Sequence, residues 1–128
     1  NNYSYLSLDE KEWKLGFKKK SNILQNIITL SKIKKIPLSI TKGKEGSNLI
    51  YLNKNYFCPT FIDKTVDTTG CGDAFFVITT LMNIIGCQKK LIPFIGNTYA
   101  GLHGQFFGNE RIISKTLYLK YLKSILNF

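Results

Sequence analysis

Apolar and polar positions along the first third of the chain predict one strand followed by two helices. Residues 3 to 8 read as a short strand, and residues 8 to 17 as a helix whose first turn carries acidic side chains, which are favourable there. Residues 21 to 35 predict a second helix, because isoleucine and leucine recur about every 3.6 positions and form one apolar face. Pro37 ends this periodicity.

The middle of the chain predicts short strands separated by turns. The strands are expected at residues 36–41, 47–52 and 56–61. The letters "KGKEG" and "NKN" between them are typical of turns. Pro59 indicates that the last strand is an edge strand or ends there, because proline cannot donate to a sheet.

The remaining chain predicts helices, at residues 74–86, 89–106 and 114–126. Ser114 is placed to cap the last one. An order of strand, helix, strands and then helices favours a layered α/β arrangement with mostly helical packing toward the C-terminal end. With 128 residues and 44% hydrophobic content, residues 1–128 are expected to form a single domain.

Composition excludes some classes of protein. The longest nearly apolar stretch, residues 74 to 87, contains polar positions and is shorter than the roughly 20 residues that span a bilayer, so no membrane partner is expected. Cys58, Cys71 and Cys87 have neither metal-ligand spacing nor an even number for pairing. These thiols favour a reducing, cytoplasmic localisation.

The formal net charge of +10 raises the alternative of a basic nucleic-acid-binding domain. Arg111 is the only arginine, although arginine is the usual bidentate reader of guanine and phosphate. The lysines are scattered and are not interleaved with aromatic residues as in a single-strand groove. We therefore expect no nucleic-acid partner.

The segment "VDTTGCGDAFF" at residues 66 to 76 is the strongest candidate for chemistry. It precedes a predicted helix, so the backbone N–H groups of Gly70, Cys71 and Gly72 are expected to face outward at a positive helix end and to bind an anion. Asp73 is then a candidate general base beside a bound phosphoryl group. The alternative is that Asp67 and Asp73 are ordinary helix caps.

Three segments resemble one known family. "VDTTGCGDAF" is similar to the D-T-T-G-A-G-D-A-F motif of the ribokinase-like (PfkB) carbohydrate kinases, with Cys71 in place of alanine. "SITKGKEGS" resembles the T-x-G-x-x-G segment of that family. Asn97 and Ala100 fall on a predicted helix where the family has a nucleotide contact, and Gly108 follows at about the family's distance.

The resemblance implies a ribokinase-like, Rossmann-like layered fold and ATP-dependent phosphorylation of a sugar hydroxyl. Asp73 would be the base, and the N–H groups of Gly70, Cys71 and Gly72 would stabilise the transferring phosphoryl group. The residues that would line the nucleotide site are Thr41, Gly43, Gly46, Asn97 and Ala100. The resemblance further implies Mg²⁺ held by Glu10 through water, and a monovalent cation such as K⁺ held by Asp67 and Thr69, with a carbonyl ligand from Gly108.

The resemblance covers only the C-terminal part of the family, whose sugar-binding region and lid are not found here. The segment "SLDE" is similar to the family's N-x-x-E, with Ser7 replacing asparagine and Glu10 retained. We expect the 128 residues alone not to phosphorylate a sugar and to self-associate as a homo-oligomer through an unpaired strand. A truncated module that binds nucleotide without catalysis is the competing interpretation, and the sequence does not identify the sugar.

Overall fold

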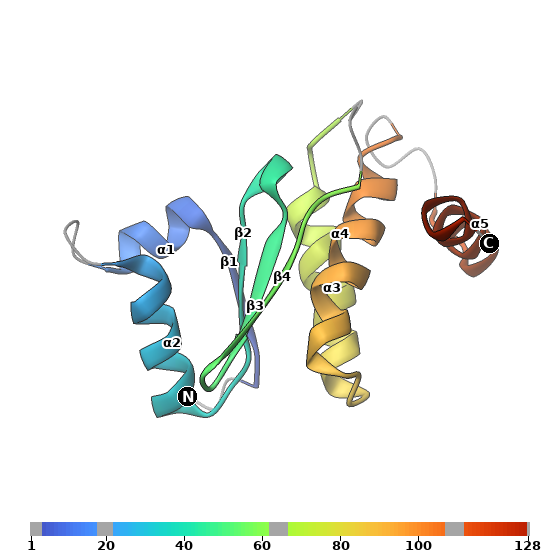
Figure 1. The fold of residues 1–128 in the computed structure, drawn as a ribbon. Coiled ribbons are helices and arrows are strands. Elements are labelled where there is room, and N and C mark those ends of the chain that lie inside the picture. The colour runs from blue at the N-terminus through green and yellow to red at the C-terminus, as the bar shows by residue number, and fades with distance from the viewer. Residues whose placement is uncertain (1–3, 18–21, 62–66, 107–111, 128) are drawn as a thin grey trace.

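The computed structural model describes residues 4–17, 22–61, 67–106 and 112–127. They form three layers around a four-stranded sheet (Figure 1). Helices α1 (Glu10–Gly16) and α2 (Ile23–Lys34) cover one face of the sheet. Helices α3 (Cys71–Ile84) and α4 (Ile92–His103) cover the other face, and α5 (Lys115–Leu126) lies outside them, against α4.

The strands follow chain order in the sheet, and their directions bring the ends of several strands to one edge. They are β1 (Leu6–Asp9), β2 (Leu38–Thr41), β3 (Ser47–Tyr51) and β4 (Lys54–Cys58). β1 is parallel to β2, whereas β2 with β3 and β3 with β4 are antiparallel. The strands β1, β2 and β4 therefore end at the same edge, where α3 begins and α4 ends (Figure 1). We call it the upper edge.

Local sequence explains where two of the helices begin. The Asp9 carboxylate accepts a hydrogen bond from the Glu12 N–H, and the Glu12 carboxylate accepts one from the Asp9 N–H, both at 2.8 Å. This reciprocal capping box satisfies two N–H groups at the start of α1. Ser114 caps α5 as expected, accepting from the Leu117 N–H at 3.2 Å.

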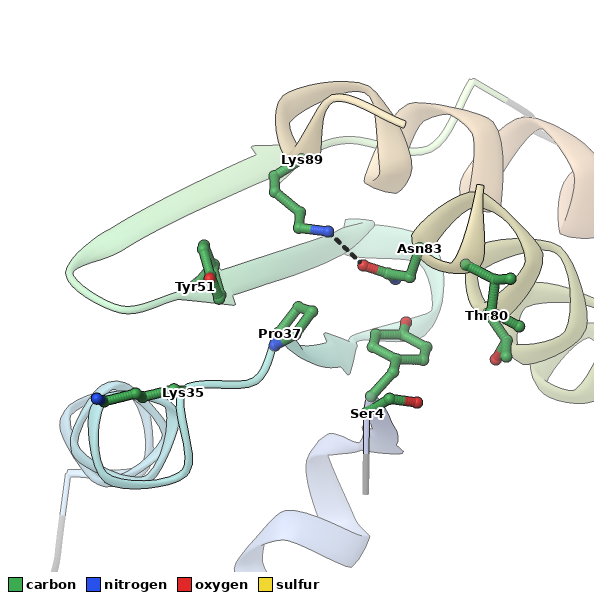
Figure 2. Close-up of a pocket in the computed structure, with 9 residues that line it drawn as sticks. Ser4, Lys35, Pro37, Tyr51, Thr80, Asn83 and Lys89 are labelled. Carbon is green, nitrogen blue, oxygen red and sulfur yellow. Dashed lines mark hydrogen bonds between the residues drawn. The ribbon is translucent and has the colours of Figure 1, made fainter. Parts of the chain in front are cut away.

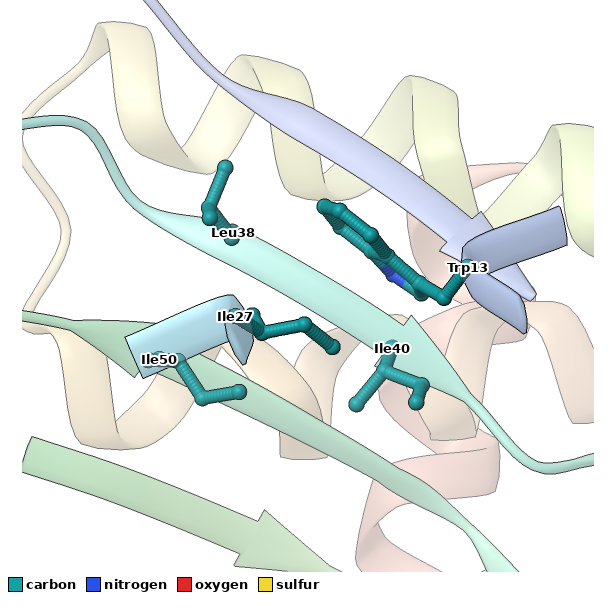
Figure 3. Close-up of a cluster of buried hydrophobic side chains, with 5 residues drawn as sticks. All are labelled: Trp13, Ile27, Leu38, Ile40 and Ile50. Atoms are coloured by element: carbon teal, nitrogen blue, oxygen red, sulfur yellow. The ribbon is translucent and has the colours of Figure 1, made fainter. Parts of the chain in front are cut away.

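One hydrophobic core fills the space between the sheet and the helices α1 and α2. Its buried members are Trp13, Ile27, Leu38, Ile40 and Ile50 (Figure 3). The indole N–H of Trp13 donates to the Ser39 carbonyl at 3.0 Å, so the ring is buried without an unpaired donor. Burial of each large aliphatic side chain contributes about 1.5–3 kcal/mol to folding.

A buried polar network ties the opposite face of the sheet to α3. The Tyr5 hydroxyl lies 2.7 Å from Ser39 Oγ and 2.9 Å from Thr79 Oγ1. Burial raises the pKa of the Tyr5 hydroxyl, although its hydrogen bonds to Ser39 and Thr79 oppose the rise. Leu49 and Ile92 are fully buried beside Tyr5 and join β3 to α4.

The order and type of the predicted elements agree with the structure, while the boundaries differ by up to three residues at many element ends. β4 begins at Lys54, inside the predicted turn, because Leu52 takes the left-handed conformation (φ 55°) and shortens the turn. The predicted helix at 89–106 is divided into the 3₁₀ turns η2 (Lys89–Leu91) and the helix α4. α3 begins at Cys71, three residues before the predicted start.

One side of α3 is apolar and uncovered. The side chains of Val77, Leu81, Ile84 and Ile85 are 54%, 48%, 71% and 70% exposed, and their spacing places them on one helical face. An exposed contiguous apolar surface of this kind favours association. No helix in the described ranges is long and apolar enough to cross a bilayer.

We expect the 128-residue chain to self-associate in solution through this face as well as through the unpaired strand expected from the sequence, and we expect Val77→Lys/Leu81→Lys to shift it toward monomer. Sedimentation velocity measures the distribution. The control is Leu15→Lys/Ile33→Lys, which adds the same charge at residues that are 88% and 69% exposed on α1 and α2. A parent chain that is already monomeric, or equal dissociation by the two double variants, would contradict this expectation.

Candidate active site

The segments singled out from the sequence meet at the upper edge of the sheet. Asp9, the last residue of β1, pairs with Thr41, the last residue of β2, and Glu10 follows at the start of α1. The 3₁₀ turn η1 (Gly43–Glu45) follows β2 at the same edge. The first turn of α3 also lies at this edge (Figure 1). Chain topology thus gathers three motifs that are far apart in the sequence.

Gly70 starts α3 in a conformation that favours glycine. It is the N-cap residue, at φ 78° and ψ −3°, and no side chain caps the helix. The interpretation of Asp67 and Asp73 as caps of α3 is therefore wrong. Glycine takes this left-handed conformation without strain, so the chain can turn sharply into the helix here. Because glycine has no side chain, nothing from Gly70 covers the N–H groups of the first turn.

The first turn of α3 offers backbone donors to a ligand. The first N–H groups of a helix have no partner within it. The Cys71 N–H donates to the Thr68 carbonyl at 3.2 Å, so this member of the expected donor set is already engaged. The N–H groups of Gly72 and Asp73 have no such partner within the described residues, and both residues are exposed. The Asp73 N–H is a donor that the sequence interpretation did not include.

Asp67 orders the loop that leads into this turn. Its carboxylate Oδ1 accepts a hydrogen bond from the Thr69 N–H at 2.8 Å, and its own N–H donates to the Gly104 carbonyl at 3.1 Å. The loop is thereby attached to the end of α4. Asp67 and Thr69 are adjacent in it, as a cation site requires, while Gly108 lies outside the described residues.

The surroundings of Cys71 favour the neutral thiol over the reactive thiolate. Burial raises the pKa of its thiol, and the Asp67 carboxylate raises it further. Its Sγ donates weakly to the Asp67 carbonyl at 3.6 Å. A neutral thiol in this position acts as a small packing group beside the helix start.

Asp73 lies in the exposed first turn of α3, where a carboxylate also interacts favourably with the helix dipole. Within the described residues, no hydrogen bond or ion pair engages its side chain. A general base must come within hydrogen-bond reach of the proton that it abstracts, and an exposed carboxylate without a protein partner is open to such a contact.

Asn97 and Gly46 lie against the end of β4. The Asn97 amide Nδ2 donates to the carbonyls of Cys58 at 2.7 Å and Pro59 at 3.1 Å, and its Oδ1 accepts from the Ser47 hydroxyl at 2.8 Å. Asn97 is 8% exposed. Its amide therefore joins α4 to β3 and to the end of β4, and nucleotide contact by Asn97 stays a prediction.

The loop after β2 contains two glycines, of which Gly46 is buried and Gly43 is exposed. Gly46 has φ 112°, and a Cβ there would lie 2.2 Å from the Cys58 carbonyl oxygen, so only glycine fits. Gly43 is exposed, and a Cβ there would meet nothing within 4 Å. Thr41 and Ala100 are half-buried. Gly43 and Thr41 are thus the better placed of these residues to meet a ligand.

Glu10 is the residue that the sequence predicts to hold a metal, and it lies at the upper edge, at the start of α1. Its Oε1 accepts a hydrogen bond from Lys14 Nζ at 2.6 Å. This bond, the charge of Lys14 and the charge of Lys42 lower the pKa of Glu10. No three metal-ligating side chains gather within the described ranges. Mg²⁺ is usually bound by one or two carboxylates together with waters and substrate phosphates, so the ionised Glu10 fits such a site. Ser7, the other residue of the "SLDE" segment that was compared with the family, lies within β1, opposite Ser39.

His103 is a neighbour of the site, and none of the sequence motifs includes it. A Cβ on Gly70 would lie 3.1 Å from His103 Nε2. No sequence pattern indicates this contact, because 33 positions separate His103 from Gly70. Helix packing brings the two together.

A pocket of about 140 Å³ lies at the opposite edge of the sheet, away from the motif (Figure 2). Lys89 Nζ points into it and donates to Asn83 Oδ1 at 3.0 Å, and it also lies 5.8 Å from the centre of the Tyr51 ring. Figure 2 shows Lys35 extending away from these residues. The ammonium group of Lys89 is therefore engaged within the protein, and the pocket is separate from the candidate site.

Comparison with known proteins decides the family. Residues 2–77, more than half of the chain, match the model of the pfkB family carbohydrate kinases. The chain belongs to this family. The prediction of a ribokinase-like PfkB protein from three short segments is confirmed. No curated protein matches the chain.

Solved structures show the same fold. Ribokinase from Thermotoga maritima is 22% identical, with a TM-score of 0.81, over 94% of this chain and 42% of the other. Arabidopsis thaliana ribokinase, complexed with ribose and ATP, is 24% identical with a TM-score of 0.79 over 94% and 41%. An Escherichia coli protein assigned as a ribokinase II, in complex with ATP and Mg²⁺, is 17% identical with a TM-score of 0.80 over 98% and 40%.

These comparisons establish the ribokinase-like α/β fold that was predicted. The chain spans about two fifths of the length of these structures. The identities are too low to transfer individual residue roles, so the roles of the site residues rest on the geometry described above.

We predict that Asn97→Ala lowers the free energy of unfolding by about 2–4 kcal/mol, because it leaves the Ser47 hydroxyl and two carbonyl groups without their partner. Urea denaturation measures the change. The matched control is Asn48→Ala: Asn48 is also buried, but it makes one side-chain hydrogen bond, to Asn55, and its Oδ1 is unpaired in the described structure. Equal losses in the two variants would contradict the account.

Proposed function

We propose that this chain supplies the nucleotide-binding and phosphoryl-transfer part of an ATP-dependent kinase that phosphorylates a hydroxyl group of a sugar or sugar-like molecule. The observation that carries the proposal is the first turn of α3, which presents the N–H groups of Gly72 and Asp73 and an unengaged carboxylate at one exposed point. Membership of the pfkB family supports it. A fold-related ribokinase with bound ribose and ATP indicates the class of substrates.

The turn suits phosphoryl transfer because it provides charge stabilisation and a base together. The N–H groups of Gly72 and Asp73 lie at the positive end of the α3 dipole and would stabilise the negative charge of the γ-phosphoryl group. The Asp73 carboxylate would accept the proton of the sugar hydroxyl as its oxygen attacks the γ-phosphorus. The bond from the γ-phosphorus to the bridging oxygen then breaks, and ADP leaves.

The loop after β2 and the end of α4 would bind the rest of the nucleotide. Thr41 and Gly43 would lie beside the ribose and phosphates, because an exposed glycine lets a ligand approach the backbone closely. Gly46, Asn97 and Ala100 would complete this side of the site, with the Asn97 amide acting mainly by holding α4 and β4 in place.

Two cations would assist. Glu10 would hold Mg²⁺ through water, and Mg²⁺ would neutralise charge on the β- and γ-phosphates. Asp67 and Thr69 would hold a monovalent cation such as K⁺ beside the first turn of α3, where a positive charge strengthens anion binding.

A module that binds nucleotide without catalysis is the second candidate. The chain spans about two fifths of the length of the solved kinases to which it is similar. We propose that the 128 residues alone do not transfer phosphate, because in-line positioning of a sugar needs groups beyond those described. By full-length kinase we mean a protein that contains this chain together with segments like those that the longer solved kinases have in addition. The free thiols of Cys58, Cys71 and Cys87 support a cytoplasmic location.

We predict that Asp73→Asn in the full-length kinase lowers kcat by about 100-fold or more, since it removes the general base. The dissociation constant of ATP should change little, because the backbone donors remain. Steady-state kinetics with a panel of pentoses, hexoses and nucleosides, with ADP release coupled to a spectroscopic signal, measures turnover. Asp73→Glu is the control, since it keeps a carboxylate at this position and should retain more turnover than Asp73→Asn. Undiminished turnover by Asp73→Asn would exclude the assignment.

A further inference from the structure

One side chain from beyond the end of β4 holds the loop that follows β2. The Thr60 hydroxyl donates a hydrogen bond to the Lys44 carbonyl, in the middle of η1, at 2.6 Å. The two residues are 16 positions apart, so the bond joins separate segments of the chain. Among the residues that the structure describes, no other side-chain hydrogen bond reaches residues 42–46. The Thr60 hydroxyl is thus the side-chain anchor of this loop.

Backbone hydrogen bonds give the loop its shape but do not attach it to β4. The Lys42 N–H donates to the Gly46 carbonyl at 2.9 Å, and the Gly46 N–H donates to the Gly43 carbonyl at 3.2 Å. All three residues belong to the loop itself. Gly46, at the end of the loop, packs closely against the Cys58 carbonyl oxygen. The exposed turn η1 is held from outside the loop by the Thr60 hydroxyl.

The segment that carries Thr60 is itself held by α4. On one side of Thr60, the Pro59 carbonyl accepts a hydrogen bond from the Asn97 amide at 3.1 Å. On the other side, the Phe61 ring lies edge-on to the Phe94 ring, with the ring centroids 5.5 Å apart. Both neighbours of Thr60 are therefore attached to α4, so the hydroxyl acts from a defined position.

The same helix orders the start of α3. The Gly104 carbonyl, directly after α4, accepts from the Asp67 N–H at 3.1 Å. A nucleotide bound as proposed would contact the loop after β2 and the first turn of α3 at the same time. Both sides of the site are thus held relative to α4, and Thr60 makes the connection for the loop after β2. Loss of the Thr60 bond would release one side of the site and leave the other in place.

We propose that Thr60 is a positioning residue for the nucleotide, because its hydroxyl holds η1 and Gly43 where they receive the ribose and phosphates of ATP. The inference rests on the proposed function and deepens it, since it names the residue that sets nucleotide affinity on the loop side of the site. Thr60 acts through the loop and not on the reacting atoms. Without the bond the loop spends less time in its binding conformation, and the apparent dissociation constant rises by the inverse of that fraction.

The test is calorimetric titration of full-length kinase carrying Thr60→Val with a non-hydrolysable ATP analogue and Mg²⁺. Valine keeps the shape of the side chain and removes the hydroxyl. We expect the dissociation constant to rise about three- to tenfold, the scale of one neutral hydrogen bond. KM for ATP should rise with it, measured with the panel sugar that gives the fastest turnover. At saturating ATP, kcat should stay within about twofold of the parent value, because bound nucleotide restores the position of the loop.

Two further variants separate positioning from general destabilisation. Thr60→Ser keeps the donor and should bind the analogue like the parent. Thr29→Val removes a hydroxyl that donates to the Gln25 carbonyl at 2.9 Å on α2, and it should also bind like the parent. An unchanged dissociation constant in Thr60→Val, or an equal rise in either of these two variants, would overturn the role of Thr60. A parent kinase that does not bind the analogue would contradict the proposed function, and the role of Thr60 with it.

Discussion

The buried amide of Asn97 is the constraint on which the arrangement of the site depends. Its three hydrogen bonds reach the start of β3 and the end of β4 from the middle of α4. A buried amide tolerates little displacement, because each lost bond leaves a polar group unsatisfied. This fixes the position of α4 along the sheet, and with it the position of Gly104 and His103 at the upper edge, where they contact the loop that starts α3.

The start of α3 is kept open within a well-packed structure, as the proposed binding of a phosphoryl group requires. A side chain from a capping residue would occupy the donors, and here the N-cap is Gly70 without a side-chain cap. The loop is ordered instead from the side, by Asp67 and by the end of α4. Stability is thus supplied by neighbouring elements, while the N–H groups of Gly72 and Asp73 are left for a ligand.

Local patterns in the sequence were sufficient for the order of elements and for the family. The apolar periodicity of residues 21 to 35 identified the buried face that contains Ile27, because that face follows directly from helical geometry. The start of α3 was placed too late, since a glycine pair disfavours a helix locally and only the tertiary structure shows Gly72 inside one. The bonds of Asn97 and the contact between His103 and Gly70 join residues far apart in the chain. No local pattern encodes them.

The central claim is that the first turn of α3 holds the phosphoryl group that is transferred. A crystal structure of the full-length kinase with a non-hydrolysable ATP analogue and Mg²⁺ tests it most directly. The account predicts γ-phosphate oxygens within hydrogen-bond distance of the N–H groups of Gly72 and Asp73, with the adenosine on the side of the loop after β2. A γ-phosphate bound elsewhere, with this turn in contact only with water, would contradict it.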